Sequence, residues 1–335
     1  MHFHGWKRRD FITLFIGAAS GWPLIARAQN STRMRRIAWM DSFHEDDPNA
    51  KARVKAFLQV MEKLGWVVGS NLTIDYRWNL FDVERARPAG AEILNLAPDV
   101  ILCGGTPSAL AMQQATRTVP IVFAFVTDPV GQGIVTNLAH PSSNITGFSY
   151  FEPTIASKWL ELLTEIAPLI NRVALMFNPV SSPYSPLYYQ SIAAAAPTRM
   201  VKTVTVLVRD LSDIEQVMTK LGHEQGNGII FSPDAFLYQN RALIIELAAR
   251  HRLPAIYGLP GTAAEGGLIY YVVDIVDLCR KAAAYIDRIL RGEKPGDLPV
   301  QQPTKFEMTI NLKTAKALGL TVPNTLLVSA DEVFE

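Results

Sequence analysis

Four polar residues are each followed directly by a proline, at or just after the end of a short apolar run: Thr106, Asp128, Asn178 and Ser232. A polar residue before proline is typical of a helix start, with the polar side chain as N-cap and the proline in the first turn. Helix starts at the carboxyl ends of parallel strands turn free backbone N–H groups toward a crevice. Helix capping explains each site equally well on its own, but together the four predict a polar cleft between two halves of the chain.

A small ligand such as an amino acid offers a carboxylate and an ammonium group, which need donors on one side and an acid on the other. The candidate hydroxyl and amide groups are Ser42, Thr106, Thr127 and Asn178. The candidate acids are Asp128, Asp234 and Asp274. Asp128 is the first choice for the ammonium, because no basic residue neighbours it in sequence. Aromatic residues near strand ends could form the walls, although single aromatic residues more often pack in a core: Phe43, Phe125, Tyr150, Tyr184, Tyr257 and Tyr271.

The sequence motifs of common enzyme chemistries are missing. The chain has no G-x-G-x-x-G after a strand, no G-x-x-x-x-G-K-[ST], no H-E-x-x-H and no G-x-S-x-G. We therefore expect no catalytic residue and no cofactor. The acidic segment 41–47 suits a metal and equally a solvated loop, and we assign it no metal. An exported α/β enzyme acting on a small substrate is the alternative function, and a ligand-sensing domain is a third.

Short apolar runs alternate with amphipathic segments, which predicts an α/β fold. In the first half, strands are expected at 37–40, 72–76, 100–103 and 121–125, and helices at 49–64, 83–96 and 108–116. In the second half, strands are expected at 173–177, 203–208, 228–231, 255–257 and 268–272, and helices at 155–166, 211–221, 241–251 and 275–290. This alternation predicts parallel sheets with helices on both faces.

The length of 335 residues exceeds what one hydrophobic core usually organises, so two lobes are expected. We expect two Rossmann-like lobes joined by a hinge, with residues 34–147 plus about 270–300 in lobe 1 and 148–269 plus about 301–335 in lobe 2. The Pro-rich segment 295–303 looks like a crossing or an edge strand. Because strand ends of both lobes would contact one ligand, hinge closure is expected on binding.

Charge and composition limit the partners. The formal net charge is +1 and no stretch concentrates Lys and Arg, so no nucleic-acid partner is expected. No apolar span of membrane length follows residue 28, so the mature chain should not insert into a membrane, and we expect a monomer. Cys103 and Cys279 have neither C-x-x-C spacing nor the number of a disulfide framework, which predicts buried thiols. A disulfide between them stays open for an exported protein.

Residues 1–28 look like a Tat-type signal peptide. The twin arginine Arg8-Arg9 precedes an apolar run over 11–25, and Ala26-Arg27-Ala28 has the A-x-A spacing of a cleavage site. The apolar run is interrupted by glycine and proline and is shorter than the ~20 residues needed to span a bilayer. We therefore expect cleavage after Ala28 and a periplasmic location.

Several segments resemble one family of proteins. They are 69–71, 103–109, 120–123 with 128–130, and 144–147, and the most specific match is the tail over 290–300, 303–306 and 310–320. These segments are similar to the ABC transporter substrate-binding family that includes tryptophan- and tyrosine-binding members. The segment 268–274 is bulkier than in many members, so the identity of the ligand does not transfer.

The resemblance implies a type I periplasmic binding fold that closes on its ligand, with a membrane permease and its ATPase as partners. It implies the periplasmic solute-binding component of an ABC importer, and no enzyme. The ligand would be a small molecule, an amino acid or an aromatic or organic acid, held in the cleft between the lobes.

Replacing both Arg8 and Arg9 with Lys should block export, because the twin arginine addresses the precursor to the Tat pathway. The precursor should accumulate in the cytoplasm, whereas the wild-type signal should yield a mature N-terminus at Gln29. Cell fractionation and N-terminal sequencing measure both outcomes. Normal export of the double variant with an intact N-terminus would refute the assignment.

Overall fold

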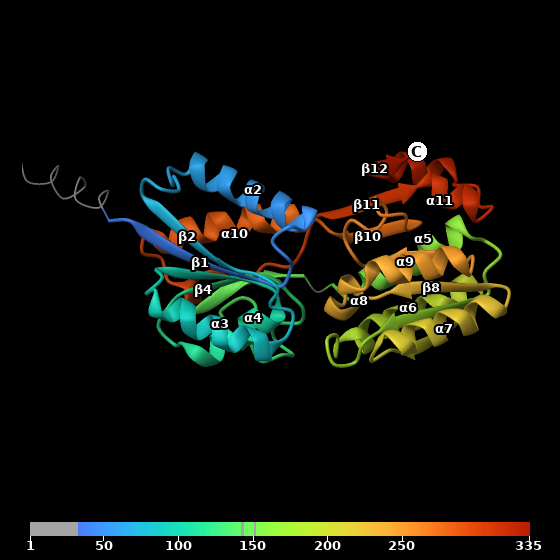
Figure 1. The fold of residues 1–335 in the computed structure, drawn as a ribbon, viewed down its shortest axis with the longest axis horizontal. Coiled ribbons are helices and arrows are strands. Elements are labelled where there is room, and N and C mark those ends of the chain that lie inside the picture. Colours follow the sequence, from blue (N-terminus) through green and yellow to red (C-terminus); the bar gives the residue numbers. More distant parts are fainter. Residues whose placement is uncertain (1–32, 142–143, 151) are drawn as a thin grey trace, which may run out of the picture.

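Residues 33–141, 144–150 and 152–335 are described by the computed structural model, in which two lobes lie side by side (Figure 1). The expected signal peptide and its cleavage site lie outside these residues. Each lobe contains a sheet of mostly parallel strands covered by helices, so the predicted two-lobed α/β fold is confirmed.

The first sheet is entirely parallel, with the strand order β2-β1-β3-β4-β5. The elements of this lobe are β1 (Arg35–Asp41), α2 (Pro48–Lys63), β2 (Leu72–Arg77), α3 (Val83–Asn95), β3 (Val100–Gly104), α4 (Thr106–Ala115), β4 (Ile121–Val126) and β5 (Ile145–Ser149). α2 contacts α10 (Ile275–Leu290), and α3 contacts α4. The two pairs cover opposite faces of the sheet, which explains why the central strands are buried apolar runs.

The second sheet has seven strands in the order β12-β11-β10-β9-β8-β6-β7. Its lobe contains α5 (Ile155–Ile166), β6 (Arg172–Phe177), α6 (Ser185–Arg199), β7 (Lys202–Leu207), α7 (Leu211–His223), β8 (Asn227–Phe231), α8 (Ala235–Gln239), α9 (Arg241–Arg250), β9 (Ala255–Tyr257), β10 (Ile269–Val273), β11 (Phe306–Asn311), α11 (Leu312–Ala317), α12 (Asn324–Ser329) and β12 (Glu332–Phe334). β11 runs antiparallel to β10, and the strands from β6 to β10 are parallel to one another.

The two sheets repeat one strand order. In each, the first strand in sequence (β1 or β6) lies between the second (β2 or β7) and the third (β3 or β8), followed by the fourth and fifth. The strand order reverses beside the first strand of each sheet, which makes that position a topological switch point. Ligands of open α/β sheets bind at such a switch point, outside the carboxyl ends of the strands. Each lobe therefore has its own switch point.

The chain crosses between the lobes after β5, between β10 and α10, and from the 3-10 helix η2 (Pro295–Asp297) to β11. α10 packs on the first lobe although the strands before and after it belong to the second (Figure 1). Gln301 forms a bridge with Phe148 beside β5, as expected for an edge or crossing segment. The crossing before α10 is joined to the crossing before β11, because Asp274 N donates to Lys305 O at 3.0 Å and the Lys305 ammonium lies 2.8 Å from the Asp274 carboxylate.

The helix starts differ from the prediction that each polar residue before proline is an N-cap. The N-cap residues of α4, α6 and α8 are Gly105, Tyr184 and Asp234. Helix α6 was not predicted, since its sequence contains two prolines and an alanine run in place of a clear apolar stripe. The polar residues before proline correctly marked loops at the strand ends, but other residues are the N-caps of the helices.

Cys103 and Cys279 are free and buried, in clusters on opposite faces of the first sheet. Burial raises the pKa of each thiol to about 12, so both stay protonated at neutral pH and unreactive. Within the described part of the chain, no helix is both long and apolar enough to cross a bilayer.

A buried ion pair connects β1 to α2. Arg53 and Asp41 are both fully buried, and Arg53 Nη2 lies 2.9 Å from Asp41 Oδ1. Asp41 also accepts hydrogen bonds from Trp39 Nε1 and from the Phe43 backbone N–H. The guanidinium carbon lies 4.0 Å from the ring centre of Phe43 and 4.8 Å from that of Phe125. Arg53 therefore holds two aromatic rings at the carboxyl end of the sheet.

Replacing Arg53 with Met should destabilise the protein by about 3–5 kcal/mol, because it leaves the Asp41 carboxylate buried without its counter-charge. Arg36→Met is the matched control, since Arg36 pairs with Asp75 at 3.1 Å but keeps 36% of its side chain exposed. That variant should lose about 1 kcal/mol or less. Urea unfolding measures both losses, and equal losses would show that the buried pair has no special role.

Candidate functional site

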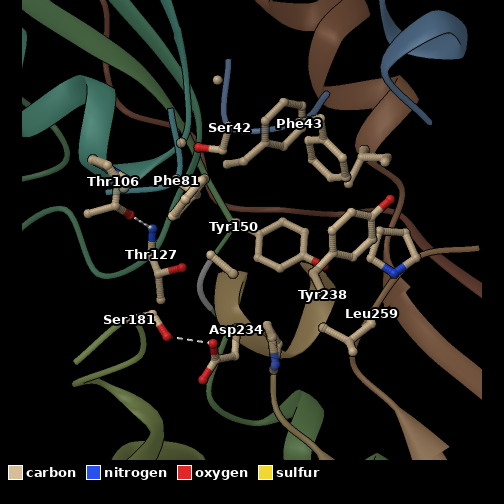
Figure 2. Close-up of a pocket in the computed structure, with 18 of the residues that line it drawn as sticks. Ser42, Phe43, Phe81, Thr106, Thr127, Tyr150, Ser181, Asp234, Tyr238 and Leu259 are labelled. Carbon is tan, nitrogen blue, oxygen red and sulfur yellow. Dashed lines mark hydrogen bonds between the residues drawn. The ribbon is translucent and has the colours of Figure 1, made fainter. Parts of the chain in front are cut away.

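The carboxyl ends of the strands of both sheets face one another and enclose a cavity of about 150 Å³. The first lobe contributes residues at or after the ends of all five of its strands and Ile275 at the start of α10, and the second contributes residues that follow β6, β8 and β9. The side chains with polar groups are Ser42, Thr106, Thr127, Ser181, Asp234 and Gln239. The aromatic rings are Phe43, Phe81, Phe125, Tyr150, Tyr184 and Tyr238. Figure 2 shows Thr106 and Thr127 close together in the wall, with Ser181 and Asp234 near each other below them.

The start of α4 opens into the cavity. Gly105, Thr106 and Pro107 line it, and no side chain caps this helix. The Thr106 hydroxyl accepts a hydrogen bond from the Thr127 backbone N–H at 3.1 Å. A Cβ on Gly105, whose φ is +148°, would lie 2.5 Å from Ser42 Oγ, so only glycine lets the two loops approach this closely. The cavity thus contains an uncapped helix N-terminus beside two hydroxyl groups, which suits an anionic group.

Phe125 has a left-handed backbone conformation, with φ +63°, where the pairing of β4 with β5 shifts register. A bulky residue seldom adopts this conformation, and such strain is typical of binding sites. The shift directs the ring to the cavity wall and against Arg53. The Asp41–Arg53 pair therefore lies directly behind two rings of the cavity.

Asp234 joins two loops of the second lobe. Its Oδ2 accepts from the Asn178 backbone N–H at 2.6 Å, and its Oδ1 accepts from Ser181 Oγ at 2.6 Å. Oδ1 also accepts from the backbone N–H groups of Phe236 and Leu237. Burial raises the pKa of the Asp234 carboxyl, and these donors act in the opposite direction by stabilising the carboxylate.

Two half-buried tyrosines of the wall, Tyr150 and Tyr184, are neutral at neutral pH. Tyr184 donates to the Pro233 carbonyl at 3.1 Å, and burial raises its pKa to about 12, with the hydroxyls of Ser182 and Thr127 opposing that shift. Burial, followed by the nearby charges of Tyr184 and Glu307, raises the pKa of Tyr150 further still.

The structure brings together six of the eleven predicted site residues: Ser42, Thr106, Thr127, Tyr150, Tyr184 and Asp234. Phe43 and Phe125 also lie in the wall, as expected for aromatic residues at strand ends. The other five predicted residues do not line this cavity: Asp128, Asn178, Tyr257, Tyr271 and Asp274.

Asp128 turns back onto its own loop. Its φ is +46°, and its carboxylate accepts from the Gly131 backbone N–H at 2.9 Å. Asn178 has a similar local role, because its Oδ1 accepts from the backbone N–H groups of Val180 and Ser181. Both side chains stabilise turns that shape the loops next to the cavity.

The remaining three predicted site residues lie in the core of the second lobe or in the crossings between the lobes. Tyr257 is 1% exposed and stacks on Phe231, and Tyr271 stacks on Phe306. Asp274 caps α10 and pairs with Lys305. Burial raises the pKa of Asp274, but Lys305 and the Asp277 backbone N–H outweigh it and hold this pKa below its ordinary value.

The acidic segment 41–47 is used internally. Asp41 pairs with Arg53, and Asp47 caps α2 by accepting from the Asn49 backbone N–H. Among the residues that the structure describes, no group of three or more His, Cys, Asp and Glu side chains is placed to hold a metal ion.

Sequence reasoning missed several wall residues, notably Phe81, Ser181, Tyr238 and Gln239. Tyr238 lies on the short helix α8 and not at a strand end, so the strand-end rule could not find it. Arg53 did leave a signal, since it occupies a buried position of α2 in the stripe of Ala50, Ala56 and Phe57. An arginine in an apolar stripe requires an acid nearby, and Asp41 ends a buried strand.

Known proteins resemble this chain over most of its length. It is 26% identical over 291 residues to a tyrosine-binding protein of Clostridioides difficile. The aligned residues cover 86% of this chain and 83% of that protein. A structure of a conserved domain protein from Vibrio cholerae has a TM-score of 0.81 at 26% identity, covering 90% of this chain and all of that chain.

Two further structures differ in how well they superpose. The ABC domain in complex with L-Trp from Streptococcus pneumoniae has a TM-score of 0.81 at 23% identity, over 90% of this chain and 99% of that chain. The ligand-free, open structure of a substrate-binding protein from Clostridium difficile has a TM-score of 0.69 at 25% identity, over the same shares of the two chains.

The sequence also matches the model of one protein family, in line with two lobes that enclose a cavity. The model described as ABC transporter substrate binding protein matches residues 44–334, which is nearly all of the described chain. This is a family of binding proteins and not of enzymes, so the alternative of an exported enzyme is set aside. The chain belongs to the ABC transporter substrate-binding protein family.

Proposed function

We propose that this chain is the periplasmic component of an ABC importer and binds a small carboxylate with an aromatic ring, an amino acid or a related acid, between its lobes. The observation that carries the proposal is the composition of the cavity wall, in which six aromatic rings surround the uncapped start of α4. Family membership supports a membrane permease and its ATPase as partners. We expect the mature chain to act as a monomer.

The carboxylate would bind at the first lobe. The backbone N–H groups at the start of α4 have no partner within the helix, and the positive end of the helix dipole favours a negative charge there. The Thr106 hydroxyl lies in the same wall and can donate a hydrogen bond to the carboxylate, since it only accepts from the Thr127 backbone N–H. The Ser42 hydroxyl donates to the Leu80 carbonyl at 3.1 Å and would have to turn away from it to donate to the ligand. No lysine or arginine lines the cavity in the described chain, so this helix start is the main source of positive potential.

The ring would lie among the aromatic side chains. A cavity of about 150 Å³ has room for a single aromatic ring with short substituents. Edge-to-face and stacked contacts with Phe43, Tyr150 and Tyr238 would bind such a ring more strongly than its area alone. The similar protein that binds tyrosine supports this choice of ligand class.

An ammonium group would bind at Asp234, in place of Asp128. Asp234 is the one carboxylate in the wall of the described cavity. Its Oδ1 already accepts three hydrogen bonds, whereas Oδ2 accepts one, from Asn178. Oδ2 therefore has a free lone pair for a ligand cation.

The mature protein should be stabilised by aromatic carboxylates in a thermal-shift screen of L-tyrosine, L-tryptophan, L-phenylalanine and their des-amino acids. A ligand at 100 times its Kd adds about 2.7 kcal/mol, which raises Tm by several degrees. Aliphatic acids of similar charge are the control and should have less effect, because they do not use the rings. A screen in which no aromatic carboxylate shifts Tm at millimolar concentration would overturn the proposal.

Asp234→Asn should weaken binding of an aromatic amino acid by about 10- to 150-fold, the loss expected for one charge-assisted hydrogen bond. The des-amino analogue has no ammonium and should bind the variant and the wild type alike. Asparagine keeps an oxygen for the donors at Oδ1 but places an NH2 group opposite the Asn178 backbone N–H, so the des-amino analogue also reports any disturbance of the loops. Asp128→Asn is the matched control and should leave Kd within about threefold. Calorimetric titration decides, and the reverse ranking of the two variants would return the ammonium to Asp128.

A further inference from the structure

Tyr238 contacts both the cavity and the opposite lobe. Its ring lines the cavity from α8 in the second lobe, and it meets the edge of the Phe43 ring at 4.6 Å between centres (Figure 2). Its hydroxyl donates to Asp47 Oδ2 at 2.8 Å and accepts from Asn49 Nδ2 at 3.1 Å. Asp47 and Asn49 belong to the first lobe, at the start of α2. One side chain thus joins the ligand wall to a contact between lobes.

Arg241 completes this contact. Its Nη2 lies 3.3 Å from Asp47 Oδ2, and its Nε donates to Glu265 in its own lobe. The guanidinium carbon lies 4.3 Å from the centre of the Tyr238 ring. Asp47 is 8% exposed, so its carboxylate has exchanged most of its water for Tyr238 and Arg241. Moving the lobes apart would separate both partners from Asp47.

We propose that Tyr238, Asp47 and Arg241 form a latch that holds the lobes closed, with Tyr238 coupling the latch to the occupied cavity. The latch rests on the proposed function, since it regulates access to the same site. A ligand ring packed on Tyr238 orients the hydroxyl toward Asp47, and the closed latch keeps the ring of Tyr238 in the wall. The TM-score of 0.69 to a ligand-free, open structure leaves room for a different arrangement of the lobes in this chain, as the latch requires.

Unlike the other wall contacts, the latch acts on the equilibrium between the open and closed forms. Asp41, Arg53 and Phe43 lie within the first lobe and would keep their contacts with one another whether the lobes are open or closed, whereas Phe43 would lose its contact with Tyr238 on opening. The hydrogen bond from Tyr238 exists only when the lobes meet. It therefore shifts the equilibrium between open and closed forms, and the apparent affinity falls with the fraction of closed protein.

Tyr238→Phe tests the latch, because it keeps the ring in the wall and removes only the hydroxyl. Spin labels at Lys55→Cys and Arg250→Cys, on exposed helix positions of the two lobes, report the distance between lobes. The native cysteines are buried and should not be labelled. Without ligand, the latch predicts that the wild type populates the short distance and that Tyr238→Phe lowers the ratio of closed to open protein by about 10-fold or more.

Two further variants keep the test specific. Asp47→Asn can still cap α2 through Oδ1 but loses the acceptor of both Tyr238 and Arg241, so it should open the lobes at least as much as Tyr238→Phe. Adding Tyr238→Phe to Asp47→Asn should then have little further effect, because the Tyr238 hydroxyl has already lost its carboxylate acceptor. Tyr189→Phe is the control, since the Tyr189 hydroxyl donates to Thr203 within one lobe and its ring does not line the cavity. It should leave the distances unchanged.

The distances between the spin labels distinguish a failure of the latch from a failure of the proposed function. An unliganded wild type without a closed population, or one that Tyr238→Phe leaves unchanged, would overturn the latch whatever the ligand is. L-tyrosine is the probe for function: it should shorten the wild-type distance, and its dissociation from Tyr238→Phe should be about 10-fold faster or more. A working latch with no response to any aromatic carboxylate would refute the ligand class alone.

Discussion

The fully buried ion pair between Asp41 and Arg53 is the interaction on which the binding site depends. A charge in the core is tolerated only with its partner and its hydrogen bonds, so the pair holds the end of β1 and the middle of α2 in one relative position. The loop between them carries Ser42 and Phe43 into the wall of the cavity. The same loop ends at Asp47, the acceptor of the proposed latch. The wall and the contact between lobes therefore start from one rigid point.

The repeated strand order explains why the cavity lies where it does. Each sheet has a switch point at its first strand, and the loops that follow β1 and β6 both contribute to the wall. The two halves of the cavity are built differently. The first lobe offers an uncapped helix start and hydroxyls, and the second offers Asp234, whose donors tie together the loops after β6 and β8. The cavity is thus positive on one side and negative on the other, which suits a zwitterion.

The crossings restrict how the lobes can move. Asp274 and Lys305 join the crossing before α10 to the crossing before β11 by a backbone hydrogen bond and an ion pair. Gln301, in the crossing before β11, accepts from the Ser149 backbone N–H at the end of β5, where the first crossing starts. The latch residues Asp47, Tyr238 and Arg241 come from a loop and helices outside the crossings. Rotation about the joined crossings would open the cavity and break the latch contacts, and would leave the cores of both lobes intact.

The sequence by itself determined the alternation of strands and helices, the two lobes and the loops at strand ends, because these follow from local apolar patterns. It therefore located Ser42, Thr106, Thr127 and Asp234 in the cavity, although it missed α6, whose stripe is weak. Only the tertiary structure decided where the other side chains point. The backbone of Asp128 turns its carboxylate onto Gly131, and Tyr257 and Tyr271 stack within the second lobe. Tyr238 and Asp47 are 191 positions apart in sequence, and only the packing of the two lobes brings them together.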